Sequence, residues 1–464
     1  MDGKPRTESH GQPGGRGLGR AHPPSTSAGE PPLWRRTWHH VPVASDVIGR
    51  TSLWRHRDFL LLWGGQAVSE TGSQITVLAM PLVAVVALGA STFRVGLLSA
   101  AQTVAYLLVS LPAGALVERL GKRRVMVWSD LARLAVIGSV PLAAAAGALT
   151  LGQLYAVALA SSVLSVFFSV AYPAYLPTLL DREQLTDGNG KLGTTQSFAQ
   201  IAGPGLGAAL VGLFGAATAM TADAVSFLAS AGGLWAIRNE ETRAAEPPGD
   251  ERQGLRQQMR DGLAYVLHEP ILLRGVLWSG SANFFVIMVE SLGPVFLVRT
   301  LHLRPGYVGL LLGLGAVGGV AGGLASGRLA RRLGSARVCW LSMTVFSLPG
   351  LLIPAAGPGA RVLLFALGWM SWTFSATVCA VALLSYRQAT CPPELLARVS
   401  ASSRWINWGT LPLGGVAAGA LGTALGVRQT LWIAVVGGCA SGLWLFFSPL
   451  RGMRDIPAAR IRLG

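Results

Sequence analysis

The sequence has little charge and few cysteines for its length. Only 13% of its 464 residues are charged, while 51% are hydrophobic. A soluble protein of this size needs a larger charged fraction to cover its surface, so the composition predicts an integral membrane protein. The four cysteines are far apart and lack the paired spacing of a metal site. We read them as buried, reduced and structural, and expect neither a disulfide framework nor a metal centre. They are Cys339, Cys379, Cys391 and Cys439.

The motifs of several function classes are also missing. No phosphate loop of the form G-x-x-x-x-G-K-[ST] occurs, since Gly190-Lys191 is followed by Leu192, so ATP is not expected to drive the protein directly. The glycines from Gly313 to Gly318 match a dinucleotide fingerprint, but they lie in an apolar segment with no strand before it. The net charge of +16 could suggest nucleic acid, yet the basic residues punctuate apolar segments instead of forming a solvated basic surface. We expect no enzyme, no cofactor and no nucleic-acid partner.

Long apolar segments are what the sequence has instead. We predict twelve membrane-spanning helices, each close to the twenty or so residues that a bilayer requires, and hence an all-α membrane protein. The predicted spans are 59–87, 95–117, 125–147, 152–179, 194–215, 217–237, 272–298, 307–329, 336–356, 361–385, 403–424 and 429–449.

The connections between these spans predict the domain organisation. Residues 1–57, rich in Gly, Pro, Ser and Arg, are expected to form a disordered tail without a signal peptide. Two six-helix bundles, 58–237 and 271–450, should flank a linker at 238–270, and residues 451–464 should form a second tail. Within the linker, Leu255, Met259, Leu263 and Val266 have helical spacing with arginines nearby. This pattern fits either a helix on the membrane surface or an ordinary soluble linker helix.

Orientation follows from the distribution of positive charge. With the N-terminus inside, 32 of the 38 Lys and Arg residues fall in the tails and the cytoplasmic connections or within three residues of them. Cytoplasmic loops of membrane proteins are enriched in these residues, so both termini are predicted to be cytoplasmic.

A charged turn separates the second and third spans and is repeated later. It runs from Gly114 to Arg124 as Gly-Ala-Leu-Val-Glu-Arg-Leu-Gly-Lys-Arg-Arg and includes Glu118, Arg119 and Gly121. Its spacing recurs 213 residues later around Gly334, which predicts two related halves. In the fifth span, Gly203-Pro204-Gly205-Leu206-Gly207-Ala208 forms a second glycine-rich motif.

These motifs resemble those of the major facilitator superfamily. The first resembles its loop motif G-x-L-a-D-r-x-G-r-k-r, with Glu118 in place of the usual Asp, and the second resembles the exporter motif G-P-x-x-G-G, with Ala208 as its last residue. Phrases such as Arg57-Asp58-Phe59 and Tyr172-Pro173-Ala174-Tyr175 are similar to the drug:proton antiporter branch that includes macrolide-efflux and enterobactin-exporter-like proteins.

The resemblance implies a fold and a mechanism. Two parallel six-helix repeats would enclose a central cavity lined mainly by the first, fourth, seventh and tenth spans, and rocking of the halves would alternate access to it. It also implies that the charged turn, with Asp130 and Arg133, forms a conformational lock, and that Gly203, Pro204 and Gly207 belong to a gate helix. The lock residues are Gly114, Glu118, Arg119, Gly121, Arg124, Asp130 and Arg133.

Embedded carboxylates are the candidates for proton coupling, because every histidine lies outside the spans and isolated charge in the bilayer costs about 2.5 to 3.5 kcal/mol. Glu70 is the first candidate, since Gln66, Glu70 and Gln74 share one helix face. The alternative is a structural carboxyl. Glu290, on one face with Asn283, is the second candidate. Asp223 is expected to be a structural or interfacial acid.

Helical spacing also predicts residues of the cavity. Hydroxyl and aromatic side chains follow one another on the fourth and tenth spans, a mixture that suits an amphipathic organic solute. The cavity candidates are Gln66, Gln74, Ser165, Ser169, Tyr172, Asn283, Trp369, Thr373 and Thr377.

We therefore predict a secondary transporter of the bacterial plasma membrane, monomeric and multi-pass, which exports an antibiotic, a secondary metabolite or a siderophore-like molecule in exchange for protons. An importer or a lysophospholipid transporter of the same fold is one alternative. A membrane sensor or scaffold that moves no solute is the alternative from another class.

Overall fold

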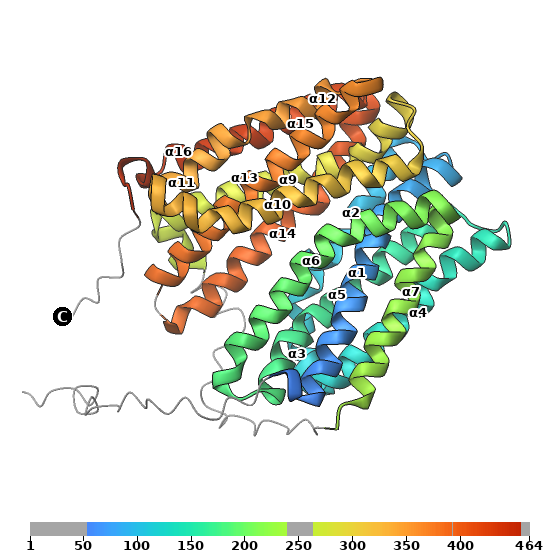
Figure 1. The fold of residues 1–464 in the computed structure, drawn as a ribbon, viewed down its shortest axis with the longest axis horizontal. Coiled ribbons are helices and arrows are strands. Elements are labelled where there is room, and N and C mark those ends of the chain that lie inside the picture. The colour runs from blue at the N-terminus through green and yellow to red at the C-terminus, as the bar shows by residue number, and fades with distance from the viewer. Residues whose placement is uncertain (1–52, 239–262, 392, 456–464) are drawn as a thin grey trace, which may run out of the picture. The chain divides into compact units, whose positions relative to one another are not determined.

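The computed structural model describes residues 53–238, 263–391 and 393–455. The described residues form helices and short connections (Figure 1). Inside a bilayer, backbone N–H and C=O groups must bond within the chain, and a helix satisfies them locally. Long runs of Leu, Val, Ala and Gly with few charges therefore fold as helices.

The described part of the first half contains seven α-helices. The first span continues beyond α1 as a π-helical segment, Val83–Ala87, and the second span is divided at Val109 into α2 and α3. The helices are α1 (Arg57–Leu82), α2 (Thr92–Leu108), α3 (Ser110–Leu120), α4 (Lys122–Ala145), α5 (Leu151–Leu179), α6 (Arg182–Phe214) and α7 (Ala216–Ala236).

The second half repeats this order. Its first helix also continues as a π-helical segment, Phe296–Thr300, and its third span combines α11, a π-helical segment, a short 3-10 turn and α12. The helices are α9 (Pro270–Val295), α10 (Pro305–Leu333), α11 (Ser335–Leu341), α12 (Leu352–Ala355), α13 (Leu363–Thr390), α14 (Pro393–Ala424), α15 (Val427–Ser441) and α16 (Leu443–Phe446).

Twelve spans in two sets of six account for this order of helices, as predicted. By length and hydropathy alone, eight helices of the described chain qualify as membrane spans, or nine if the bent α6 counts as one. The others do not qualify for identifiable reasons. The second span is broken at Val109, and α7 and α14 are diluted by glycine and polar residues.

Two helices begin well before the spans predicted from the apolar residues. The helix α6 begins at Arg182 and α14 at Pro393, whereas the spans were predicted to begin at 194 and 403. Both helices start with polar residues, which a hydropathy criterion excludes. A helix that has formed in the membrane can continue beyond it wherever its residues tolerate helical geometry.

The backbone shows the internal repeat more clearly than the side chains do. The π-helical segments begin at Val83 and Phe296, 213 residues apart. The same offset separates Gly121 from Gly334, with φ of 90° and 98°, and Gly89 from His302, with φ of 59° and 55°. The loop motif found in the sequence thus belongs to a longer structural repeat.

The two halves pack together through one continuous apolar core. It combines Leu82 and Val95 of the first half with Leu292, Phe296 and Val308 of the second. Across the same contact α2 packs on α14 and α6 on α10, with small residues between them. A β-carbon on Gly96 would lie 2.5 Å from the oxygen of Gly415. Arg299 adds a hydrogen bond of 2.6 Å from its Nη2 to the Ala90 oxygen.

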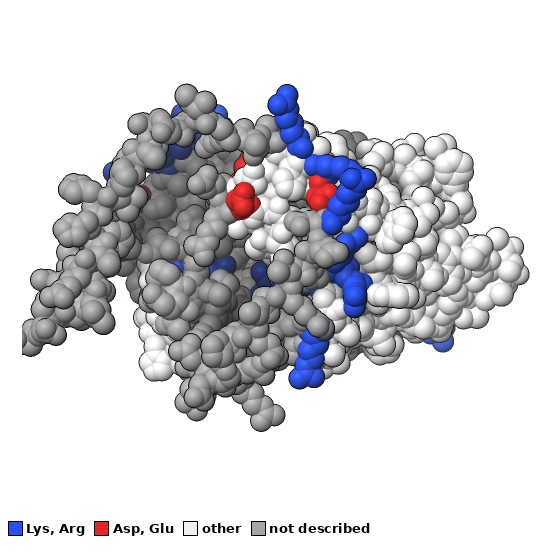
Figure 2. Space-filling model, turned by 90° about the horizontal axis from the view of Figure 1, so that it is seen from below, with Lys and Arg blue, Asp and Glu red and all other residues white. Residues whose placement is uncertain are grey.

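Towards the other end of the helices the cores are separate. One apolar cluster around Phe59, Met126 and Tyr175 belongs only to the first half, and another around Cys339 and Tyr386 belongs only to the second. Lys and Arg side chains form a band on the face shown in Figure 2. With the predicted orientation, the halves therefore meet near the outer side and diverge towards the cytoplasm.

The described end of the linker is helical from Leu263 to His268. Val266 is buried in the core of the second half, whereas Leu263 is exposed. Leu255 and Met259, with most of the predicted amphipathic pattern, lie outside the described residues, as do residues 1–52 and 456–464 of the predicted tails.

Candidate functional site

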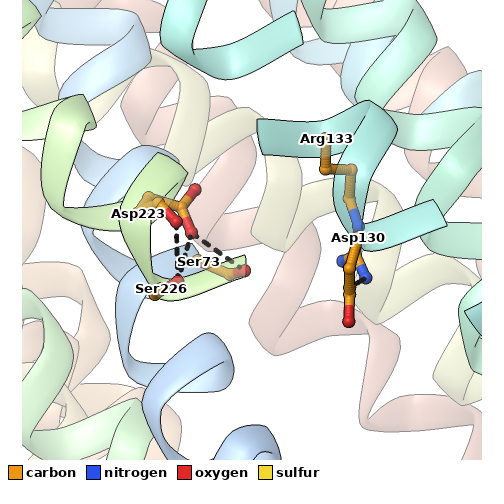
Figure 3. Close-up of polar contacts among 5 residues, drawn as sticks. All are labelled: Ser73, Asp130, Arg133, Asp223 and Ser226. Atoms are coloured by element: carbon orange, nitrogen blue, oxygen red, sulfur yellow. Dashed lines mark hydrogen bonds and ion pairs between the residues drawn. The ribbon is translucent and has the colours of Figure 1, made fainter. Parts of the chain in front are cut away.

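A buried ion pair lies on α4. Asp130 and Arg133 are separated by three residues, so they occupy one helix face, and Arg133 Nη2 donates to Asp130 Oδ1 at 2.5 Å (Figure 3). Asp130 is inaccessible to solvent and Arg133 is 7% exposed. The guanidinium lies over the rings of Phe168 and Phe227, at 4.7 and 4.4 Å, so it is held between two aromatic faces.

A second buried acid, Asp223 on α7, lies near this pair. Its Oδ1 accepts hydrogen bonds of 3.4 Å from Ser73 of α1 and from Ser226 of its own helix (Figure 3). The positive charge of Arg133 also acts on it. Asp223 is fully buried, and its Oδ2 has no hydrogen-bond partner. It therefore belongs to the interior of the first half and not to an interface.

Glu70 is brought to the same part of the molecule by α1. Its side chain is half-buried, interacts with Gln74 one turn away and feels the charge of Arg133. Tyr106 of α2 and Tyr172 of α5 in turn feel the charge of Glu70. Four helices of the first half thus contribute side chains around one accessible carboxyl.

The polar residues predicted on α1 and α5 make few internal contacts. The Oε1 atom of Gln66 and the hydroxyl of Tyr172 are buried without a partner. Ser165 is half-buried, and the hydroxyl of Ser169 donates to the backbone oxygen of Val166 at 2.9 Å. Gln66 and Tyr172 therefore retain hydrogen-bonding capacity that the described protein does not use.

In the second half, α9 carries Asn283 and Glu290. Asn283 is half-buried, and its Nδ2 donates to the Asn407 oxygen on α14 at 3.2 Å. Glu290 is exposed although it lies within the predicted seventh span. The 213-residue offset also makes Asn283 the structural counterpart of Glu70.

The residues predicted on α13 are directed at a neighbouring helix. Trp369 is buried against Gly315 of α10, and Thr373 donates to the Gly315 oxygen at 2.5 Å. A β-carbon on Gly319 would lie 3.4 Å from the hydroxyl oxygen of Thr377. The glycines of α10 therefore provide the surface on which α13 packs.

The gate motif lies directly against the polar face of α1. Gly203 is in such close contact with Gln74 that a β-carbon would overlap that side chain, and Gly207 packs on Ile75. The next residue of α6, Ala208, packs against Gly309 of α10. The motif thus connects the Glu70 region to the second half.

The predicted lock residues begin at the turn between α3 and α4. Gly121 has the left-handed backbone that glycine adopts easily, while Gly114 is half-buried and Arg119 and Arg124 are exposed. Arg123 anchors the turn to α7 by donating to the oxygens of Leu234 and Trp235, at 2.9 and 2.8 Å. The side chain of Glu118 lies outside the described residues.

Sequence reasoning missed the proximity of Asp223 to Arg133, because the two residues are distant in the chain. It also did not single out two arginines of the second half, Arg387 and Arg404, whose charges act on each other. Arg404 could have been identified from the sequence, because it is a positively charged residue inside the predicted span 403–424. Among the described residues, no group of three or more His, Cys, Asp or Glu side chains could hold a metal ion.

Known proteins resemble the chain along most of its length. It is 24% identical to the multidrug efflux pump Tap of Mycolicibacterium fortuitum, over 80% of the chain and 90% of that protein. It is 26% identical to macrolide efflux protein A of Streptococcus pyogenes, over 82% and 92%. An uncharacterized MFS-type transporter of Bacillus subtilis (strain 168), YfiS, is 24% identical over 54% of the chain and 58% of its own length.

Solved structures show the same fold. The nucleoside transporter NupG superimposes with a TM-score of 0.67 at 11% identity, covering 84% of the chain and 98% of NupG. A bacterial homologue of the iron transporter ferroportin, in an inward-facing state, gives 0.66 at 17% identity, covering 85% and 98%.

A family description completes these comparisons. The sequence model described as Major Facilitator Superfamily matches residues 62–411, which is most of the chain. The members of this family are transporters and not enzymes. The chain belongs to the major facilitator superfamily and is a multi-pass membrane transporter.

Proposed function

We propose that the protein exports an amphipathic small molecule in exchange for protons, by alternating access, with Glu70 as the proton-binding group. The distant relationship to a multidrug efflux pump and to a macrolide efflux protein supports export and this class of solute. The separate cores on the predicted cytoplasmic side and the shared core on the outer side fit one state of such a cycle.

The position of Glu70 is the observation that carries the proposal. A carboxyl that exchanges protons with water must be accessible, and one that couples to conformation must contact several helices. Glu70 is half-buried and interacts with residues of α1, α2, α4 and α5, whereas Asp130 and Asp223 are fully buried. Protonation of Glu70 would remove a negative charge that acts on Arg133. It would therefore change the electrostatic energy of the buried charges Asp130, Arg133 and Asp223.

The contacts of α6 provide a route from Glu70 to the second half. Gln74 interacts with Glu70 and also packs against Gly203, and Ala208 of the same helix packs against Gly309. A change in the Glu70 side chain can therefore displace α6 where it meets α10. In this proposal Asp130, Arg133 and the charged turn stabilise one state of the cycle, while Gln66, Tyr172, Asn283 and Glu290 contact the solute.

Efflux measurements test this function. We would load macrolides, cationic dyes and an anionic amphipathic dye into cells that lack their own pumps and follow efflux with and without a protonophore, in cells that express the parent or Glu70→Gln. The parent should accelerate efflux and lose the effect with the protonophore, and Glu70→Gln should lose it even with the gradient intact. Asp181→Asn is the control, because it removes an exposed acid that precedes α6 and makes no side-chain capping hydrogen bond.

Two results would contradict the proposal. If Glu70→Gln, present in the membrane at the level of the parent, retains gradient-driven efflux, Glu70 does not carry the proton. If the parent expels none of the compounds at any gradient, export of this class of solute is excluded.

A further inference from the structure

Two arginines of the second half, Arg387 and Arg404, are close enough for their charges to act on each other, and neither forms an ion pair with an acid among the described residues. Arg387 is in the last turn of α13 and Arg404 is on α14, and their positive charges repel each other. The ion pairs among the described residues involve other cations, namely Arg133, Lys191 and Arg454. The buried Nε of Arg387 has no hydrogen-bond partner. Two positive charges that repel each other, one of them with a buried and unpartnered Nε, favour an anion placed between them.

The acid on a neighbouring element is already engaged. Glu269, which precedes α9, accepts a hydrogen bond of 2.8 Å from the Tyr386 hydroxyl with one oxygen. With its other oxygen it caps α9 by accepting from Leu272 N at 2.6 Å. This carboxylate therefore holds α9 against α13 and is not the counter-charge of the arginines.

The face of α14 that carries Arg404 is the face that meets the first half. Arg404, Trp408, Gly415 and Gly419 follow helical spacing, and the two glycines pack on Gly96 of α2. Trp405 donates to the Leu107 oxygen at 3.2 Å, and α2 ends one residue later. Arg404 is exposed although it lies eleven residues inside α14. It therefore lies where the contact between the halves stops and the space between them begins.

Two aromatic side chains adjoin Arg404. The guanidinium of Arg404 lies 5.9 Å from the Trp408 ring, which meets Tyr106 of α2 edge to face at 4.4 Å. An apolar group can pack on these rings while an anionic group reaches the guanidiniums. Guanidinium binds carboxylate, phosphate or sulfonate through paired hydrogen bonds, which favours anions of this geometry.

We propose that Arg387 and Arg404 form an anion-binding subsite that takes the charged group of an anionic amphiphile, whose apolar part packs on Trp408 and Tyr106. This inference deepens the proposed export function, on which it rests, because it specifies the class of solute. The same chemistry is available in a soluble molecule and in the headgroup of an anionic lipid, so the test has an arm for each source.

A matched pair of dyes tests the subsite. The dyes 1-anilinonaphthalene-8-sulfonate and N-phenyl-1-naphthylamine share an aromatic skeleton, and only the first carries a sulfonate. Their binding to purified full-length protein in phosphatidylcholine nanodiscs would be measured without any ion gradient, for the parent, Arg387→Gln, Arg404→Gln and the double variant. Arg361→Gln, which removes an exposed arginine between the third and fourth spans of the second half, is the control.

The double variant should bind the sulfonate dye at least about tenfold more weakly than the parent does, while its affinity for the neutral dye should change by less than about twofold. Equal losses for both dyes, or no loss for either, would overturn the proposal. In a second arm, phosphatidylglycerol replaces about a fifth of the lipid. If phosphatidylglycerol competes with the sulfonate dye in the parent but not in the double variant, the subsite binds a lipid headgroup. If the parent binds the dye equally well with and without phosphatidylglycerol, the subsite binds a soluble anion.

These measurements separate the two proposals. Gradient-independent binding that depends on the arginines, in a protein that expels no solute, would retain the anion subsite and exclude export. Gradient-driven efflux, together with dye binding that is the same in the parent and in the double variant, would retain export and exclude the anion subsite.

Discussion

The buried charges of the first half have no equivalent in the second. At the 213-residue offset, Asp130 and Arg133 correspond to Met343 and Phe346, and Met343 is fully buried. Replacing a buried ion pair by apolar side chains of similar size is often neutral or stabilising. The second half shows that this position of the fold tolerates apolar residues, so we infer that the pair in the first half is retained for conformational switching and not for stability.

Removing one member of the pair should nevertheless be costly. Arg133→Gln leaves Asp130 and Asp223 without a positive charge inside the bundle, and breaking a buried pair on one side typically costs about 3 to 5 kcal/mol. We expect a large fall in the thermal unfolding midpoint of the purified protein in detergent. Arg124→Gln, on the exposed surface of the same helix, should leave the midpoint within about 1 °C of the parent, since surface substitutions usually change stability by less than about 0.5 kcal/mol.

An Arg133→Gln protein as stable as Arg124→Gln would show that the carboxyls are neutral in the folded state and need no counter-charge. The double variant Asp130→Asn with Arg133→Gln should recover part of the lost stability, because it removes both charges of the pair together.

Single residues were the least predictable level of the molecule. The i, i+3 spacing of Asp130 and Arg133 was enough to predict their contact, because one helix fixes both. The approach of Asp223 depends on how α7 packs against α1 and α4, which spacing along the chain does not contain. Likewise, helical spacing placed Trp369 and Thr373 on one face of α13, but only the packing against Gly315 shows that this face meets α10.

At the scale of helices, glycine determines where α6 can approach α1. Gly203 faces Gln74 with no room for a β-carbon, whereas Gly205, two residues later, has nothing within 4 Å of that position. The same helix thus provides a crowded and an open glycine within one motif.

This pair gives a direct test of the gate motif. Gly203→Ala should push α6 away from α1 and reduce transport at least about tenfold, because overpacking a close contact typically costs about 1 to 3 kcal/mol. Gly205→Ala should leave transport unchanged and raise helix stability by up to about 1 kcal/mol. Efflux rates normalised to the protein present in the membrane would measure both, and equal activity of the two variants would mean that the contact of α6 with α1 does not limit transport.

The order of apolar segments predicted the twelve spans, because a bilayer requires long apolar helices whatever their neighbours are. Length and hydropathy alone identify only eight or nine of them among the described residues. Hydropathy did not predict the break at Val109 that divides the second span, since the residues on both sides are apolar. It also did not predict how far α6 and α14 extend before their spans, because the first turns of these helices are polar.

At the scale of the whole described chain, the two halves are joined near one end of their helices only. Arg299 contributes to this closure, because it reaches from the end of the seventh span to the Ala90 oxygen in the first half. The bond is charge-assisted and half-buried, and it lies beside the shared apolar core.

Losing this bond should shift the equilibrium towards the state that is open on the outer side. Spin labels would be attached at Ala148→Cys and Ala360→Cys, two exposed positions in the two halves, in a background without the four native cysteines. Double electron–electron resonance would measure the distance between the two labels. Arg299→Ala should increase the population with the longer distance, whereas Arg304→Ala, an exposed arginine nearby, should not. Identical distance distributions for Arg299→Ala and the parent would show that the apolar core alone keeps this side closed.

The turn that follows the first and the seventh spans has a further consequence. Its left-handed residue is a glycine at 89 and a histidine at 302, with φ within a few degrees of each other. A residue with a β-carbon is disfavoured in that conformation by about 1 to 2 kcal/mol, so His302 follows a path that the surrounding chain imposes. At this turn the two halves thus share one backbone path with different residues. The internal repeat is stricter in shape than in sequence, so each half can carry different chemistry on the same backbone.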